Sequence, residues 1–95
     1  MKQIIDGKLY DTGTAELIAD NEFSDGNNRM SHGRATYLYK TKKGNFFSYH
    51  ATCWQGEHPY INVLSIDEAK RVYEELNDEN AVGYKTTFGV APEEA

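Results

Sequence analysis

The feature that most constrains this sequence is a long aromatic hairpin at residues 34–53, RATYLYKTKKGNFFSYHATC. Its register follows from the loop Lys42-Lys43-Gly44, which suits a type I turn followed by glycine in the left-handed region. Thr41 then lies opposite Asn45. The same register pairs the other residues across the two strands: Tyr39 with Phe47, Tyr37 with Tyr49, and Ala35 with Ala51.

This register gives the hairpin two unlike faces. Four aromatic rings gather on one face, where each cross-strand aromatic pair contributes roughly 0.5 to 1 kcal/mol beyond its burial. We expect a helix to cover that face and make it the core, in preference to an open face that stacks nucleic-acid bases. The opposite face is mainly polar and should meet water, another strand or a partner. Its residues are Thr36, Lys40, Ser48, His50 and Thr52, interrupted by Leu38 and Phe46.

The covering helix is predicted from a capping box and an apolar stripe. Ser65 stands at the cap position and Glu68 follows three residues later. Apolar residues then recur at helical spacing, so the helix should span about residues 66–77 and carry acids on its outer face. The stripe consists of Ile66, Ala69, Val72, Tyr73 and Leu76.

The remaining segments are predicted from turn chemistry. Asp6-Gly7 is a type I′ turn signal and predicts a short hairpin over residues 3–10. Residues 15–23 suit a third strand or a brief helix, and we favour a short helical turn that leads into a strand. Residues 24–33 are nearly all turn formers and predict an exposed loop. Residues 84–88 alternate like an edge strand but also suit a short helical turn.

Together these elements predict one α+β domain over residues 1–95. We expect a four- or five-stranded, mainly antiparallel sheet with one main helix packed on one face. With 39% hydrophobic and 13% aromatic residues, the chain is too apolar for a disordered protein. Its 95 residues are enough for a single core and too few for two domains.

Charge and cysteine usage narrow the class of protein further. The net charge of −5 disfavours a general nucleic-acid binder, because neutralising phosphates requires clustered lysine and arginine. The single cysteine, Cys53, cannot form an internal disulfide and fits a reducing compartment. No apolar run has the length of a signal peptide or a membrane span. We therefore expect a cytoplasmic protein with no direct contact to nucleic acid or membrane.

The sequence predicts no enzyme, cofactor or metal site. His50, Cys53 and His58 are the only cluster of soft ligands, but His50 and Cys53 should point to opposite faces of a strand. Cys53 lacks a visible base and is predicted to be an inert thiol. The glycines do not form a phosphate-binding loop. Glu74 and Glu75 are adjacent on a solvent-facing helix, where no pocket raises a carboxyl pKa for acid catalysis.

Four segments resemble small uncharacterised accessory proteins carried by phages and integrative elements of Gram-positive bacteria. These are MKQIIDGKLYDTGTAELIAD, YLYKTKKGNFFSY, LSIDEAKRVYEEL, and YKTTFG with its acidic tail. SDGNNRMSHG and HATCWQGEHPY depart most from the pattern. The resemblance implies a fold and, by analogy alone, a non-enzymatic protein that binds and inhibits a host defence protein, as CRISPR inhibitors do. It implies no catalytic residue.

Two sets of residues are candidate binding sites. The first is the acidic outer face of the predicted helix, which suits a basic groove such as the nucleic-acid channel of a defence nuclease. Its residues are Glu68, Glu74, Glu75, Asp78 and Glu79. The alternative is a small-ligand sponge that holds a phosphorylated nucleotide signal between basic and aromatic side chains. Its residues are Arg29, His32, Arg34 and Trp54.

Overall fold

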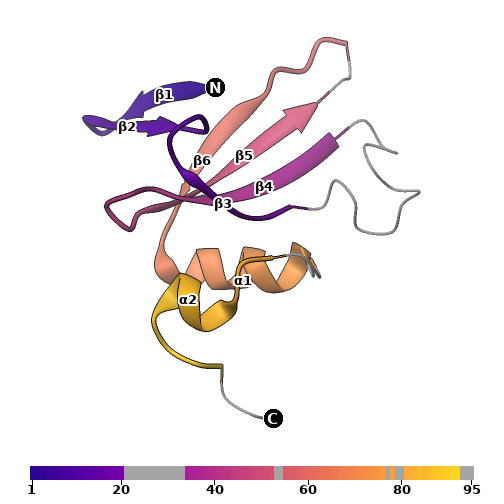
Figure 1. The fold of residues 1–95 in the computed structure, drawn as a ribbon. Coiled ribbons are helices and arrows are strands. Elements are labelled where there is room, and N and C mark those ends of the chain that lie inside the picture. The colour runs from indigo at the N-terminus through magenta and orange to yellow at the C-terminus, as the bar shows by residue number, and fades with distance from the viewer. Residues whose placement is uncertain (21–33, 53–54, 77, 79–80, 93–95) are drawn as a thin grey trace.

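A computed structural model describes residues 1–20, 34–52, 55–76, 78 and 81–92, and it has an α+β fold (Figure 1). No helix in these ranges is long and apolar enough to cross a membrane. The elements follow one another in the order β1 (Lys2–Ile5), β2 (Lys8–Asp11), β3 (Glu16–Asp20), β4 (Arg34–Lys40), β5 (Phe46–Thr52), β6 (Tyr60–Leu64), α1 (Ile66–Leu76) and α2 (Tyr84–Phe88).

The strands form two antiparallel sheets. The larger sheet has four strands in the order β3-β4-β5-β6, and β1 and β2 form a separate hairpin. Figure 1 shows this hairpin and the two helices on opposite sides of the larger sheet. The predicted class, a mainly antiparallel sheet with one main helix on one face, is confirmed.

The register predicted for the central hairpin is confirmed. The backbone N–H of Thr41 donates to the carbonyl oxygen of Asn45 at 2.7 Å, and that of Gly44 donates to the carbonyl of Thr41 at 2.9 Å. Gly44 has a φ of 89°, the left-handed conformation that the three-residue loop requires. The pairs of β4 and β5 include Tyr39 with Phe47, Tyr37 with Tyr49, and Ala35 with Ala51.

The first hairpin also follows its turn signal. Asp6 and Gly7 both have positive φ, at 52° and 76°, as a type I′ turn demands. Ile5 therefore pairs with Lys8. In the next segment the predicted strand is confirmed over Glu16–Asp20, directly after a turn that is closed by the i→i−4 bond of a single helical turn, and residues 21–23 lie outside the described residues. In that turn the N–H of Ala15 donates to the carbonyl of Asp11 at 3.0 Å.

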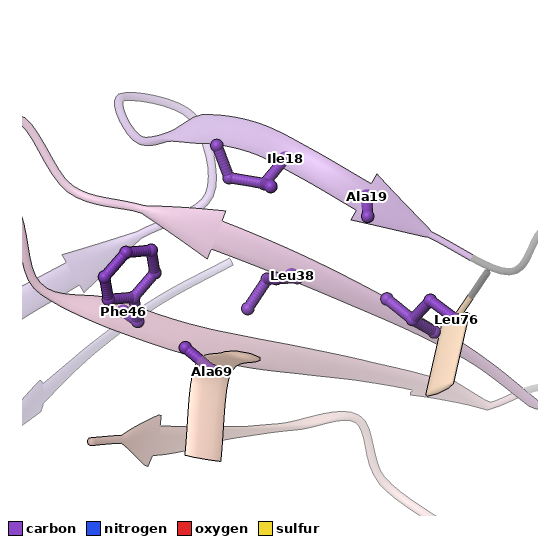
Figure 2. Packing of buried hydrophobic residues seen from close by; sticks show 6 residues of the cluster. All are labelled: Ile18, Ala19, Leu38, Phe46, Ala69 and Leu76. Carbon is purple, nitrogen blue, oxygen red and sulfur yellow. The ribbon is translucent and has the colours of Figure 1, made fainter. Parts of the chain in front are cut away.

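Helix α1 begins at the predicted capping box. The N–H of Glu68 donates to the Ser65 hydroxyl at 3.1 Å, and a Glu68 carboxylate oxygen accepts from the N–H of Ser65 at 2.9 Å. From this start the helix buries Ala69 and Leu76 against the larger sheet. Figure 2 shows Ala69 and Leu76 on either side of Leu38, in one cluster with Ile18, Ala19 and Phe46.

The face that α1 covers differs from the prediction. The helix packs on the face of Leu38 and Phe46, which are 0% and 4% exposed, and not on the aromatic face. A register shift between Leu17 and Ala19 in β3 gives this core two consecutive apolar side chains, Ile18 and Ala19. Leu38 and Phe46, the two apolar residues on the mainly polar face, are thus the buried centre of the core beneath α1.

The β1–β2 hairpin covers the aromatic face in place of the helix. The ring of Tyr10 meets the ring of Phe47 edge to face at 5.5 Å, and both residues are buried. Ile61 completes this second core. The prediction that Phe47 is a core residue is confirmed. The element that covers it is the β1–β2 hairpin and not the predicted helix.

The ambiguous segment at residues 84–88 is helical. The N–H of Thr87 donates to the carbonyl of Gly83 at 2.9 Å, and Gly89, whose φ is 80°, caps α2 directly after Phe88. Phe88 stacks on Phe46 at 5.2 Å, so α2 closes one end of the helix-side core. The alternative of an edge strand is wrong.

Candidate functional site

The outer face of α1 presents exposed carboxylates. Asp67, Glu74 and Glu75 are exposed, and they lie on the side of the helix away from the buried residues Ala69 and Leu76. None of the three is needed to hold the core. They are therefore available to meet another molecule.

Arg71 divides this acidic surface. It is exposed and lies one helical turn from Asp67 on one side and from Glu75 on the other. Its charge also contributes to lowering the pKa of Glu68. The outer face of α1 is thus a ridge of mixed sign with an acidic excess.

Glu68 serves the helix start. Hydrogen bonds from the backbone and side chain of Ser65 are the main cause of the lowered pKa of the Glu68 carboxyl, followed by the charge of Arg71. This carboxylate is already engaged by the chain itself. The predicted role of Glu68 in binding a partner would have to compete with its role in the capping box.

Asp78 ties the end of the helical segment to the sheet. Its Oδ2 accepts a hydrogen bond from the N–H of Asp20 at 3.1 Å, and the residue is half-buried. Glu79, the last member of the predicted acidic set, lies outside the described residues. The strongest remaining candidates for partner binding are therefore Glu74 and Glu75.

The structure does not test the alternative ligand set. Arg29, His32 and Trp54 lie outside the described residues. Arg34 begins β4 opposite Thr52, although its side chain is not described. That these four side chains form one ligand site stays a prediction.

A hollow of about 310 Å³ lies at the same end of the sheet. His50 stacks on Tyr60 there, with ring centroids 4.5 Å apart, and its Nε2 lies 2.7 Å from the Ser48 hydroxyl oxygen. Burial lowers the pKa of His50, which favours its neutral form. The lining residues are Ala35, Thr36, His50, Ala51, Thr52, Glu57, His58 and Tyr60.

The Ser48–His50 pair has hydrogen-bond geometry but poor access. Ser48 is 1% exposed, so a substrate cannot reach its hydroxyl in this conformation. Within the described residues, no three His, Cys, Asp or Glu side chains are grouped to hold a metal ion. Cys53, which the sequence grouped with His50 and His58, lies outside them.

A second cleft, of about 380 Å³, lies between the β1–β2 hairpin and the loop that joins β4 to β5. Lys8, Lys42 and Lys43 line it together. The sequence shows the loop lysines side by side, but Lys8 is more than thirty positions away and reaches them only through the fold. The other lining residues are Gly7, Leu9, Tyr10, Asp11, Thr14, Ala15, Thr41 and Asn45.

Part of the aromatic face extends beyond the cover of the first hairpin. Tyr37 stacks on Tyr49 with ring centroids 5.8 Å apart, and both are half-buried. Tyr39 stacks on Phe47 at 5.2 Å, and burial, followed by the charges of Tyr49 and Asp20, raises the pKa of its hydroxyl. The rings therefore mainly support one another.

These features define the class of protein only at the level of fold, as a small α+β domain with an acidic helix ridge and a lysine-lined cleft. Comparison of this chain with protein-family models, curated proteins and solved structures finds no match.

Proposed function

We propose that this domain is a non-enzymatic binding protein that occupies a basic host defence protein in the cytoplasm of a bacterial cell. The observation that carries the proposal is the exposure of Asp67, Glu74 and Glu75 on a helix whose opposite face is buried. A helix anchored in this way presents its charges on a rigid support. The resemblance to phage and mobile-element accessory proteins supplies the class of partner.

Electrostatics favour a partner with a basic groove, such as a nuclease that holds nucleic acid. Opposite charge steers the encounter and raises the association rate more than it tightens the complex. A protein bound in the groove would exclude the nucleic acid. Because the Debye length falls from about 10 Å at 0.1 M salt to about 3 Å at 1 M, association should slow markedly across that range.

The test is charge reversal at the two carboxylates that the fold leaves available. Glu74→Lys with Glu75→Lys should keep the fold, since both residues are exposed and off the apolar stripe. The double variant should retain far less of the partner in a pull-down from host lysate, with the captured protein identified by mass spectrometry. The captured nuclease, assayed with wild-type protein, should lose activity.

A matched control separates a local effect from a change in net charge. Glu16→Lys with Glu93→Lys makes the same change in charge at two sequence positions outside α1. The proposal predicts near-normal capture by this control. If the α1 variant is folded and captures the partner as well as wild type does, the ridge is a solvated surface and the proposal is overturned.

The second candidate function is a sponge for a small phosphorylated signal. The observation that favours it is the lysine-lined cleft beside the β4–β5 loop, whose described lining residues are not those of the predicted set Arg29, His32, Arg34 and Trp54. A sponge purified from its host should release an ultraviolet-absorbing nucleotide on heating. It should also gain thermal stability when that ligand is added back.

A further inference from the structure

We propose that the cleft between the β1–β2 hairpin and the β4–β5 loop binds a nucleotide that carries two or more phosphates. This assigns a site and a ligand class to the second candidate function, and its role in defence rests on that function. Binding of the nucleotide in the cleft does not rest on that function, because it is argued from the residues that line the cleft. It also lies apart from the outer face of α1.

The first step is the convergence of charge. Lys8 comes from the start of β2, and Lys42 and Lys43 come from the loop after β4, yet all three line one cleft. The chain as a whole has a net charge of −5, so this cationic cluster is opposite in sign to the net charge of the protein. The positive charges of three lysines that line one cleft repel one another, and an anion bound in the cleft would relieve that repulsion.

The second step concerns the opposing charge. Asp11 is the one carboxylate among the described residues that line the cleft. Its Oδ1 accepts a hydrogen bond from the N–H of Gly13 at 2.8 Å, which holds it in the turn before β3. A single held carboxylate cannot neutralise three lysines. The cleft therefore keeps a positive excess.

Lys40 provides an internal contrast. It is also close to this end of the sheet, but its Nζ donates to the carbonyl oxygen of Thr87 at 2.7 Å and lies over the Phe46 ring. Lys40 is thus engaged by the fold, whereas Lys42 and Lys43 are exposed. The cluster at the cleft is not needed to hold α2 in place.

The third step is the shape and chemistry of the walls. A volume of about 380 Å³ falls within the range of roughly 300 to 1,000 Å³ that small-molecule sites have. Thr41 and Asn45 add polar groups, and the Thr41 hydroxyl oxygen accepts from the N–H of Asn45 at 3.0 Å, which fixes its position. Leu9, 57% exposed, supplies an apolar wall.

A cleft lined by three lysines and an exposed leucine favours a ligand that has both a charged part and an apolar part. Ammonium groups bind phosphate oxygens as compact point charges. An apolar wall suits the flat face of a base. Two or more phosphates match three lysines better than one does. A nucleoside diphosphate or triphosphate combines these properties in one small molecule.

The experiment uses the full chain with ATP as the probe, followed by backbone amide shifts in NMR and by calorimetry. ATP should shift the amides of the two loops around the cleft. Lys42→Gln with Lys43→Gln should weaken ATP binding about tenfold or more, equivalent to about 1.4 kcal/mol. Inorganic triphosphate should bind more weakly than ATP, because it cannot use Leu9.

The matched control is Arg71→Gln with Lys85→Gln, which removes two exposed cations from the helices. It changes the net charge equally and should alter ATP affinity by less than about twofold. Equal losses in the two double variants would show only bulk electrostatics and overturn the site. Absence of ATP-dependent shifts at the cleft also overturns it.

Three further outcomes test the ligand class and separate this inference from the functions proposed above. If a short single-stranded oligonucleotide binds the same cleft more tightly than ATP, the ligand class is wrong. If nucleotide is released from purified protein but binds elsewhere, the sponge function survives and the cleft does not. If ATP occupies the cleft but no nucleotide copurifies, the site survives and its role as a sponge does not.

Discussion

The carboxylate of Asp78 accepts a hydrogen bond from the backbone N–H of Asp20 at 3.1 Å, which links the segment after α1 to the edge of the larger sheet. These residues are 58 positions apart in the chain. The sequence placed Asp78 on a partner-binding surface, because it follows the acidic helix. Its position in the structure gives it a role in stability that Glu74 and Glu75 do not have.

The first prediction follows from that bond. Asp78→Ala should lower the free energy of unfolding by about 1.5 to 3 kcal/mol, the range for a hydrogen bond to a charged group. Glu75→Ala, on the exposed ridge, should change it by less than about 0.5 kcal/mol. Urea denaturation of both variants checks this. Equal effects would mean that the Asp20–Asp78 bond adds nothing to stability.

The second prediction concerns the aromatic face. Phe47→Ala should cost about 3 to 5 kcal/mol, because its ring is fully buried between Tyr10 and Tyr39. Tyr37→Ala should cost clearly less, since Tyr37 is half-buried and lies beyond the first hairpin. Thermal and chemical unfolding can rank the two variants. The reverse ranking would contradict the placement of the β1–β2 hairpin.

The third prediction tests the turn that sets the central register. Gly44→Ala should destabilise the fold by about 1 to 2 kcal/mol, because a side chain disfavours the left-handed conformation. Gly83→Ala is the control, as its φ is −55° and an added Cβ would meet only Thr86 Oγ1, at an ordinary 3.8 Å. Gly83→Ala should be near neutral. Similar losses at both glycines would be inconsistent with this turn geometry.

The fourth prediction concerns pH. Burial lowers the pKa of His50 below its ordinary 6.5, so the unfolded chain binds a proton on this residue more readily than the folded chain does. Stability should therefore fall as pH drops through 6.5 toward the folded-state pKa. Replacing His50 with glutamine should flatten this part of the stability profile. An unchanged profile in His50→Gln would assign the effect to another group.

The elements that the sequence predicted well are those whose signals are local. Gly44 fixes the loop, and the loop fixes each pair from Thr41 outward, so the register needs no knowledge of the rest of the chain. The Ser65–Glu68 capping box likewise contains its own partners, three positions apart. In both cases a few adjacent residues decide the backbone.

The errors arose where distant segments compete for one surface. The sequence showed an aromatic face and an apolar helix stripe, which made their pairing reasonable. It did not show that Tyr10, and not the helix, would contact Phe47. Nor did it show that the register shift in β3 would bring both Ile18 and Ala19 into the core of Leu38. For the same reason the meeting of Lys8 with the loop lysines was missed.

Phe46 and Phe47 are neighbours in the chain but belong to different cores, one beneath the helices and the other beneath the first hairpin. Strand β5 thus separates the two cores, and we expect either cover to open while the other stays closed. Amide protons of β5 should be the slowest to exchange with solvent, because exposing them requires both sides to open. The amide protons of β1 and β2 should exchange faster, through local unfolding of the N-terminal hairpin alone. We therefore expect this hairpin to detach while the larger sheet and its helices stay folded.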